Sequence, residues 1–323
     1  MEARPAIYTG TVSWCIHFVY TLVSIEIQNF KDWMSIIMKK YSYNENIDTL
    51  EVQPEFVEEG IKHAEKKGYS SIRFIKLDYS NSDTTYTLDL TPLMKKDFIE
   101  AISISDTFRI AKYDIEALYT LNNLKKLTCE NKKIIFDYSK FKNLEELYIH
   151  YHKRSQNFHT LSSLKVLMLH SFSDKGCLVL SEFKKLEELS LAGSSVENLN
   201  GLEGLVNLKV LKLSYNSKVS DLTPVFKIPK LSLLHIEKCK NIGGICLSED
   251  NDSVEEMFVS EIDSLSFISR MKRLKKLKFW SLKNGELAPI IEKSPALDEV
   301  DFYPNKKHYS HTKEEINRII KGK

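Results

Sequence analysis

Leucine recurs every three residues along residues 199–216, which read LNGLEGLVNLKVLKLSYN. The spacing then shortens to two residues at Leu213, and Asn216 follows three residues later. An amphipathic helix would alternate steps of three and four residues, and a half-buried strand would alternate apolar and polar residues strictly. Neither pattern fits this segment, although leucines at every third residue suit short 3₁₀-like turns.

The same three apolar positions recur nine times between residues 124 and 302. The first position holds Leu124, Leu144, Leu164, Leu186, Leu208, Leu231, Val254, Leu274 and Leu297. The second and third hold Leu127/Cys129, Leu147/Ile149, Leu167/Leu169, Leu189/Leu191, Leu211/Leu213, Leu234/Ile236, Met257/Val259, Leu277/Phe279 and Val300/Phe302. The steps of 20 to 23 residues predict a stacked array, because no single unit of this size can bury its apolar face alone.

The best unit, Leu208-x-x-Leu211-x-Leu213-x-x-Asn216, matches the consensus L-x-x-L-x-L-x-x-N, so the sequence resembles the leucine-rich-repeat superfamily. Pro224 in SDLTPV and the spacing of the central units are similar to the 22-residue, internalin-like bacterial subclass. The resemblance implies an α/β solenoid over residues 70–305, with parallel strands on a concave face and short 3₁₀, α or irregular segments on the convex side.

Two degenerate units are expected before the nine regular ones. They are Ile72-x-x-Ile75-x-Leu77 and Ile99-x-x-Ile102-x-Ile104. The asparagine position is less regular, and only Asn216 and Asn305 keep it. Elsewhere it holds Lys132, His152, Phe172, Ser194, Cys239, Ile262 and Leu282, so the loops are expected to close by mixed means.

Caps are predicted at both ends of the array. In residues 38–69, Ile47-x-x-Leu50-x-Val52 predicts a strand, and Pro54 opens a helix that stops at Gly68. In residues 306–323, Thr312-x-x-Glu315 forms a capping box for a helix that covers the last repeat. These elements would shield the open ends of the sheet.

Residues 1–37 carry only five charged side chains, and residues 12–25 are largely apolar. Three interpretations stay open: a packed or vestigial leader, a secretory signal or an anchor through residues 12–27, and a true translation start at Met38. The apolar stretch is shorter than the roughly 20 residues of a membrane span.

Composition and the absence of known motifs disfavour several classes of function. Lys and Arg number 46 against 44 Asp and Glu, which does not favour nucleic-acid binding, and only 11 glycines disfavour phosphate loops. The five cysteines form no CxxC pair, which indicates a reducing compartment and a cytoplasmic protein. No GxxxxGK[ST], GxGxxG, GxSxG or HExxH motif occurs, so we expect neither an enzyme nor a cofactor.

Two metal interpretations are weak. Asp250-Asn251-Asp252 resembles part of a calcium loop but lacks its glycine and distal glutamate. His150 and His170 fall at the same outward position of neighbouring units and would bind zinc or copper only with a third ligand. No metal site is therefore predicted.

Aromatic, histidine and methionine side chains gather at the outward strand positions. The candidate partner-binding residues are Tyr148, His150, Tyr151, Met168, His170, Tyr215, His235, Phe258, Trp280 and Tyr303. Exposed aromatic residues on a rigid sheet are typical of interface anchors, although such positions can also pack against one another.

We therefore expect a non-enzymatic, monomeric scaffold that holds a protein partner of unknown identity on its concave face. The resemblance allows an inhibitor, immunity or effector-type protein. The alternatives are a secreted or membrane-anchored adhesin and, third, an enzyme whose site has no linear motif.

Overall fold

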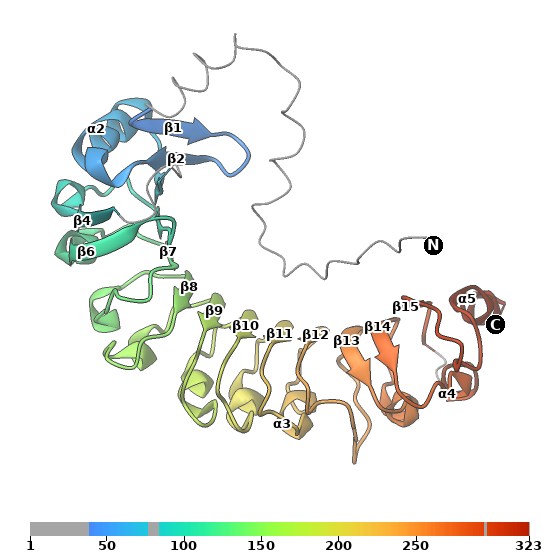
Figure 1. Cartoon of the computed structure of the whole chain (residues 1–323). Coiled ribbons are helices and arrows are strands. Elements are labelled where there is room, and N and C mark those ends of the chain that lie inside the picture. Colours follow the sequence, from blue (N-terminus) through green and yellow to red (C-terminus); the bar gives the residue numbers. More distant parts are fainter. Residues whose placement is uncertain (1–38, 77–83, 294–295, 323) are drawn as a thin grey trace, which may run out of the picture. The chain divides into compact units, whose positions relative to one another are not determined.

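The computed structural model describes residues 39–76, 84–293 and 296–322, and Lys40–Lys323 forms one compact unit. Its main element is a 13-stranded sheet in which the strands follow one another in chain order, apart from β4 and β6 (Figure 1). The strands are β1 (Tyr41–Asn44), β2 (Thr49–Val52), β3 (Ser71–Phe74), β5 (Ala101–Ile104), β7 (Lys126–Cys129), β8 (Glu146–His150), β9 (Val166–His170), β10 (Glu188–Ala192), β11 (Val210–Ser214), β12 (Leu233–Glu237), β13 (Glu256–Ile262), β14 (Lys276–Leu282) and β15 (Glu299–Phe302). Strands β2 to β15 of this sheet pair in parallel, and β1 pairs antiparallel with β2.

The register confirms all nine regular units. The second apolar positions lie opposite one another from strand to strand, as Leu189 does with Leu167 and Leu211, and so do the third positions. Every first, second and third apolar residue of the nine units is at most 3% exposed. The one-sided burial follows from the pleat of the strand, which sends alternate side chains to opposite faces.

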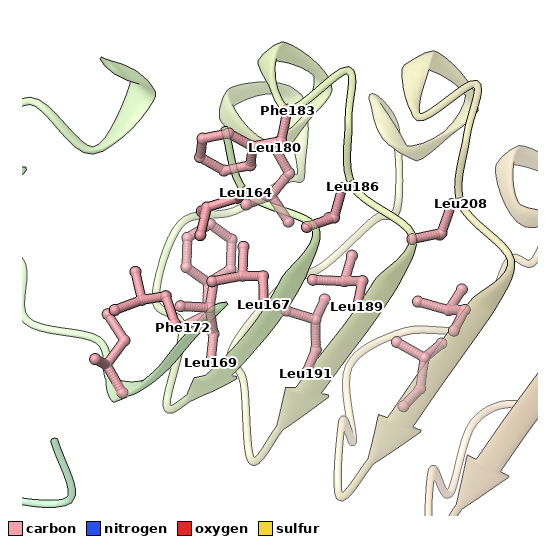
Figure 2. Close-up of a cluster of buried hydrophobic side chains, with 14 of the residues drawn as sticks. Leu164, Leu167, Leu169, Phe172, Leu180, Phe183, Leu186, Leu189, Leu191 and Leu208 are labelled. Atoms are coloured by element: carbon pink, nitrogen blue, oxygen red, sulfur yellow. The ribbon is translucent and has the colours of Figure 1, made fainter. Parts of the chain in front are cut away.

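Short helices run along the return segments between the strands. They are η3 (Thr91–Leu93), η4 (Glu116–Thr120), η5 (Tyr138–Lys140), η6 (Phe158–Thr160), η7 (Leu178–Glu182), η8 (Leu202–Gly204), α3 (Thr223–Phe226), η9 (Ser266–Arg270) and α4 (Ala288–Lys293). Figure 2 shows how Leu180 and Phe183 from one return segment point toward Leu167 of the strand. The core is this layer of leucine and phenylalanine between the strands and the return segments.

The loops close by mixed means, as the sequence predicts. Asn216 is fully buried, donates from Nδ2 to the carbonyl of Leu191 (2.9 Å) and accepts from the Ser194 N–H (2.9 Å). Cys239 replaces it in the next repeat, where its thiol lies 3.6 Å from the carbonyl of Leu213. Apolar residues are buried at the same position elsewhere, namely Phe172, Ile262 and Leu282.

Asn305, the other asparagine at this position of the motif, does not act as Asn216 does. This residue is exposed, and its side chain accepts from the Lys313 N–H (3.2 Å) and lies 3.4 Å from Glu314. It therefore joins the start of the last helix and closes no loop within the array.

The strand register predicted for the first degenerate unit was wrong. Ile72 and Phe74 are the buried strand residues, opposite Leu50 and Val52 of β2 and Ile102 and Ile104 of β5. The predicted pair Ile75 and Leu77 lies three residues too late, and Leu77 is outside the described residues. The second degenerate unit, with Ile102 and Ile104, is confirmed.

A second, two-stranded parallel sheet was not predicted. It pairs β4 (Thr85–Asp89) with β6 (Arg109–Asp114) and buries Leu88 and Ile110. Both strands lie in the longer return segments of the first units, which have room for a strand where later units have a single helical turn.

Both predicted terminal helices form. Pro54 opens η2 (Pro54–Phe56), which continues as α2 (Val57–Lys67) and ends at Gly68 in the left-handed conformation with φ 74°. At the other end, α5 (Lys313–Lys321) has the complete capping box between Thr312 and Glu315.

Helix α5 also closes the free edge of the sheet. The side-chain amide of Asn317 accepts from the Val300 N–H (3.0 Å) and donates to the Val300 carbonyl (2.7 Å). An asparagine side chain thus takes the place of the next strand on β15.

The predictions for residues 1–37, for an anchor in residues 12–27 and for a start at Met38 fall outside the described residues. Within the part of the chain that the structure describes, no helix is long and apolar enough to cross a membrane.

Candidate functional site

The outer face is defined here as the side of strands β7 to β15 that points away from the core. It carries three rows of side chains. The first row precedes the second apolar position (Lys126, Glu146, Val166, Glu188, Val210, Leu233, Glu256, Lys276, Glu299). The second row lies between the two strand positions (Thr128, Tyr148, Met168, Ser190, Lys212, His235, Phe258, Lys278, Asp301). The third row follows them (Glu130, His150, His170, Ala192, Ser214, Glu237, Ser260, Trp280, Tyr303).

Most charges on the outer face pair with one another across neighbouring strands. The ion pairs are Lys126–Glu146 (2.9 Å), Lys212–Glu188 (2.6 Å), Lys276–Glu256 (2.9 Å), Lys278–Glu299 (3.5 Å) and Lys278–Asp301 (3.7 Å). These side chains are partly exposed, so each pair contributes little to stability. Their effect is that the face presents few uncompensated charges.

The first aromatic cluster comprises Tyr148, Met168, His150 and His170 on β8 and β9. Tyr148 lies opposite Met168 in the sheet, and His150 lies opposite His170 with ring centroids 4.9 Å apart. The Tyr148 hydroxyl donates to Glu146 (3.2 Å), and burial together with the Glu146 carboxylate raises the pKa of Tyr148 to about 12. All four side chains are half-buried.

Tyr151, another of the predicted partner-binding residues, does not belong to this cluster. Its ring makes edge contacts with Phe158 and Phe172, both buried, and its hydroxyl lies 3.4 Å from Asp174. Burial is the main reason that its pKa rises to about 12. Tyr151 therefore packs onto the core beyond the end of β8.

Two of the predicted aromatic residues already hold a lysine of this chain. The Lys126 ammonium lies 5.1 Å from the centroid of the Tyr148 ring. The Lys238 ammonium lies 5.0 Å from the Tyr215 ring and donates to the Tyr215 hydroxyl (2.9 Å). Such contacts leave less of each ring for a partner.

The second aromatic cluster comprises His235, Phe258 and Trp280 on three successive strands, β12 to β14. The His235 ring stacks on Phe258 with centroids 4.4 Å apart, and Trp280 meets Phe258 edge-on at 5.2 Å. Trp280 is 43% exposed. Tyr303, the next residue of the third row, is 79% exposed, and no ring contact joins it to Trp280 among the described residues.

A shallow hollow of about 180 Å³ lies beside the second aromatic cluster. Leu233, His235 and Phe258 form its apolar part, and Glu256, Lys276 and Lys278 also line it. Leu233 was not among the predicted site residues. Its signal in the sequence is a leucine in the first row, where most other strands carry a charged residue or valine.

The three histidines of the outer face favour the neutral form. Burial is the largest cause that lowers the pKa of His150, His170 and His235. The neighbouring His170 and Lys132 lower the pKa of His150 further, while Glu237 acts in the opposite direction on His235. In the described part of the chain, no group of three or more His, Cys, Asp or Glu side chains is placed to hold a metal ion.

The calcium-like sequence Asp250-Asn251-Asp252 has a structural role. Asn251 is buried, donates to the carbonyl of Phe226 (3.1 Å) and accepts from the Val254 N–H (3.0 Å). Asp250 forms ion pairs with Arg270 and Lys272, both at 3.3 Å. The segment closes a repeat loop with its own residues.

Two cysteines at repeat positions are buried and unreactive by environment. Burial raises the pKa of the Cys129 thiol to about 12 and also raises that of Cys239. A thiol that stays protonated is a poor nucleophile, so the environment of both residues favours a structural role.

Three observations decide the fold: the nine units pair in parallel register, their leucine positions are buried, and Asn216 joins two repeats. The fold is a leucine-rich-repeat solenoid. No protein-family model and no curated protein matches the sequence.

Several solved structures are similar to this chain at low identity. An internalin of Listeria monocytogenes (inlF) is 16% identical, with 79% of this chain and 92% of that chain covered and a TM-score of 0.43. Internalin C2 (inlC2) of the same species is 22% identical, with 58% and 75% covered and a TM-score of 0.37. The functional domain of InlJ, also from Listeria monocytogenes, is 16% identical, with 71% and 48% covered and a TM-score of 0.45.

Proposed function

We propose that this leucine-rich-repeat chain is a non-enzymatic scaffold that binds a protein partner on its outer face, with the second aromatic cluster at the centre of the interface. The observation that carries the proposal is the continuous aromatic surface of His235, Phe258 and Trp280 on three successive strands. Buried aromatic residues dominate many interfaces because they bury large areas at low entropic cost.

Of the two aromatic clusters, the second is the better candidate for the centre of the interface. In the first, Tyr148 is engaged by Lys126 and Glu146, and Tyr151 packs onto the core. In the second, Trp280 remains 43% exposed, and His235 and Phe258 line a hollow of about 180 Å³. An apolar side chain of a partner could enter this hollow against Leu233 and Phe258.

The surface is also suited to rigid recognition. The three strands are joined by parallel backbone pairing on both sides, so the rings are held before a partner arrives. A preorganised surface loses less conformational entropy on binding than a mobile loop.

Affinity capture from the lysate of the native organism would test this function. The wild-type chain and the double variant Phe258→Ala/Trp280→Ala serve as parallel baits, and bound proteins are identified by mass spectrometry. We expect a partner that the double variant loses, with affinity lowered by about 2 kcal/mol or more, which is roughly 30-fold.

A matched control removes an exposed apolar side chain from a return segment. Leu178 in η7 is 70% exposed, so Leu178→Ala removes apolar surface away from the outer face. Capture that survives the double variant, or that Leu178→Ala impairs equally, would reject the outer face as the binding site. An inhibitor, an immunity protein and an effector would use the same surface, and the identity of the captured partner distinguishes them.

We further propose a reducing, cytoplasmic location. The four described cysteines are all free, and Cys246 among them is exposed. Unpaired cysteines are typical of reducing compartments. Cell fractionation of the native organism tests this location, and recovery in the membrane or secreted fraction would favour the adhesin instead.

A further inference from the structure

Glu237 and Trp280 occupy the third row on either side of a small residue. Ile236 pairs with Val259 and Val259 with Phe279, so the next residues, Glu237, Ser260 and Trp280, stand in line across three strands. Two strand spacings separate the first from the last, about 10 Å between their backbones. Ser260 is 3% exposed and accepts from the Lys238 N–H (2.9 Å), so it does not fill the row above the sheet.

The carboxylate of Glu237 has no lysine or arginine partner among the described residues. Its nearest charged or titratable neighbour is His235, whose Nε2 lies 3.6 Å away. Burial favours the neutral form of that imidazole by lowering its pKa, so it does not compensate the charge. The carboxylates of the first row behave differently, because each of them pairs with a lysine.

Glu130 is the other third-row carboxylate without a lysine partner in the described part of the chain. It accepts from the Ser105 hydroxyl (3.1 Å) and lies 3.4 Å from the Asp106 N–H. The Glu130 carboxylate is therefore engaged by groups of the neighbouring repeat. Glu237 is then the third-row carboxylate best placed to bind a cation of a partner.

Two lysines near Glu237 are engaged elsewhere. The Lys238 ammonium lies on Tyr215, and Lys212 forms an ion pair with Glu188 at 2.6 Å. No lysine of the described residues lies over the rings of Phe258 or Trp280, whereas Tyr148 and Tyr215 each hold one. The second aromatic cluster therefore combines an exposed indole, that of Trp280, with a carboxylate that forms no ion pair with a described lysine or arginine.

We propose that Glu237, Phe258 and Trp280 accept one arginine side chain of the protein partner, an inference that rests on the proposed function. A guanidinium is planar, so it can lie against an indole face while its edge donates to a carboxylate. A compact ammonium cannot do both over the distance between Glu237 and Trp280 with equal ease, which favours arginine over lysine.

The test uses the full-length chain and a small probe. The probe is acetyl-arginine amide, and its control is acetyl-citrulline amide, which has nearly the same shape and no charge. The indole N–H signals of the chain's three tryptophans are followed by NMR, and Trp280→Phe assigns the signal of Trp280. We expect the Trp280 signal to shift saturably with the arginine probe and at least several-fold more weakly with citrulline.

Two variants separate Glu237 from general charge effects. Glu237→Gln should weaken the arginine titration roughly fivefold, as expected for a partly exposed ion pair. Glu188→Gln, whose carboxylate is already paired with Lys212, should leave it unchanged. Equal responses to arginine and citrulline, or an unchanged titration in Glu237→Gln, would overturn the proposal.

The same variants distinguish this inference from the proposed function. Suppose that partner capture requires Phe258 and Trp280 but the arginine probe has no effect on Trp280. The binding surface then stands, and the arginine site is rejected. If the probe binds as expected but capture survives the double variant, the arginine site stands and the proposed interface is rejected.

Discussion

At the scale of single residues, Asn216 shows how one side chain stabilises a repeat. It is fully buried and satisfies two backbone groups, the Leu191 carbonyl and the Ser194 N–H. Both groups are shielded from water by the neighbouring repeat, so nothing else can replace these hydrogen bonds. Asn305 has the same place in the sequence motif but lies at the surface.

We therefore predict opposite outcomes for the two asparagines. Asn216→Ala leaves two buried backbone groups unsatisfied and should lower the free energy of unfolding by about 2–4 kcal/mol. Asn305→Ala should change it by less than about 0.5 kcal/mol. Urea unfolding followed by circular dichroism measures both, and equal losses would show that Asn216 has no special role.

His150 and His170 make stability depend on pH. Both pKa values are lower in the folded chain than the value of about 6.5 expected when it is unfolded. The unfolded chain therefore binds more protons as the pH falls below about 6.5. The stability that the neutral pair contributes is present above this pH and is lost as the pH falls through the folded pKa values.

We predict that His150→Gln/His170→Gln flattens the loss of stability between pH 7 and pH 5. Glutamine keeps a polar side chain of moderate size and cannot gain a proton. Thermal midpoints measured across this range give the comparison, with the exposed His159→Gln as the control variant. A double variant that loses as much stability on acidification as the wild type would contradict the assignment.

At the scale of elements, the residue after the first apolar position forms a ladder of alternating charge. Its members are Glu100, Lys125, Glu145, Lys165, Glu187, Lys209, Ser232, Glu255, Lys275 and Asp298. Each lysine of the ladder pairs with the glutamate of the preceding repeat, at 3.1, 2.6, 2.6 and 2.8 Å. The ladder largely cancels its own charge, so its lysines do not form a basic stripe.

Reversing one charge of the ladder should show how much the ladder contributes to stability. Glu187→Lys would place three lysines in line, since Lys165 and Lys209 flank the position. We expect a lower thermal midpoint at low salt and a much smaller difference in 1 M salt, where the Debye length is about 3 Å. Glu187→Gln separates lost attraction from new repulsion, and a salt-independent difference would refute an electrostatic cause.

The edge of β15 gives another prediction for an element. Asn317 bonds to both the N–H and the carbonyl of Val300, so Asn317→Ala should open the last strand and cost about 1–2 kcal/mol. Asn317→Asp keeps an acceptor for the Val300 N–H but loses the donor to the Val300 carbonyl. Its stability should lie between those of the wild type and Asn317→Ala. Hydrogen exchange at Val300 reports the opening directly, and unchanged protection in the alanine variant would count against this role.

The elements also show what the sequence could and could not predict. The nine regular units were predictable because their spacing leaves one register that buries all three apolar positions. In the first degenerate unit, both Ile72-x-Phe74 and Ile75-x-Leu77 fit the motif, and only pairing with β2 and β5 selects the former. The small sheet of β4 and β6 has no repeat signal, since it occurs once.

At the scale of the whole molecule, the sequence locates the outer face but not the state of each ring on it. The repeat register places Tyr148, Phe258 and Trp280 on that face. It does not reveal that Lys126 lies over Tyr148 or that Tyr151 turns toward the core, because side-chain torsions decide both. The sequence alone therefore could not distinguish the two aromatic clusters, because the distinction depends on side-chain positions.

The two ends of the array are closed by different means, and this leads to the last prediction. At the start, β1 pairs antiparallel with β2, whereas at the end α5 covers β15 with buried Ile316 and Ile320 and the amide of Asn317. Deleting residues 313–323 would expose both apolar surface and an unpaired strand edge. Exposed edges template pairing between chains, so the truncated chain should lose stability and self-associate.

Sedimentation and light scattering measure this outcome against the intact chain, which we expect to remain monomeric. Arg318→Ala, an exposed change on the same helix, is the control for altered charge. Association caused by the open edge should rise with protein concentration and should appear in Asn317→Ala only weakly, because α5 still covers the apolar surface there. A truncated chain that stays monomeric and unfolds at the wild-type midpoint would mean that the array ends at β15 without a cap.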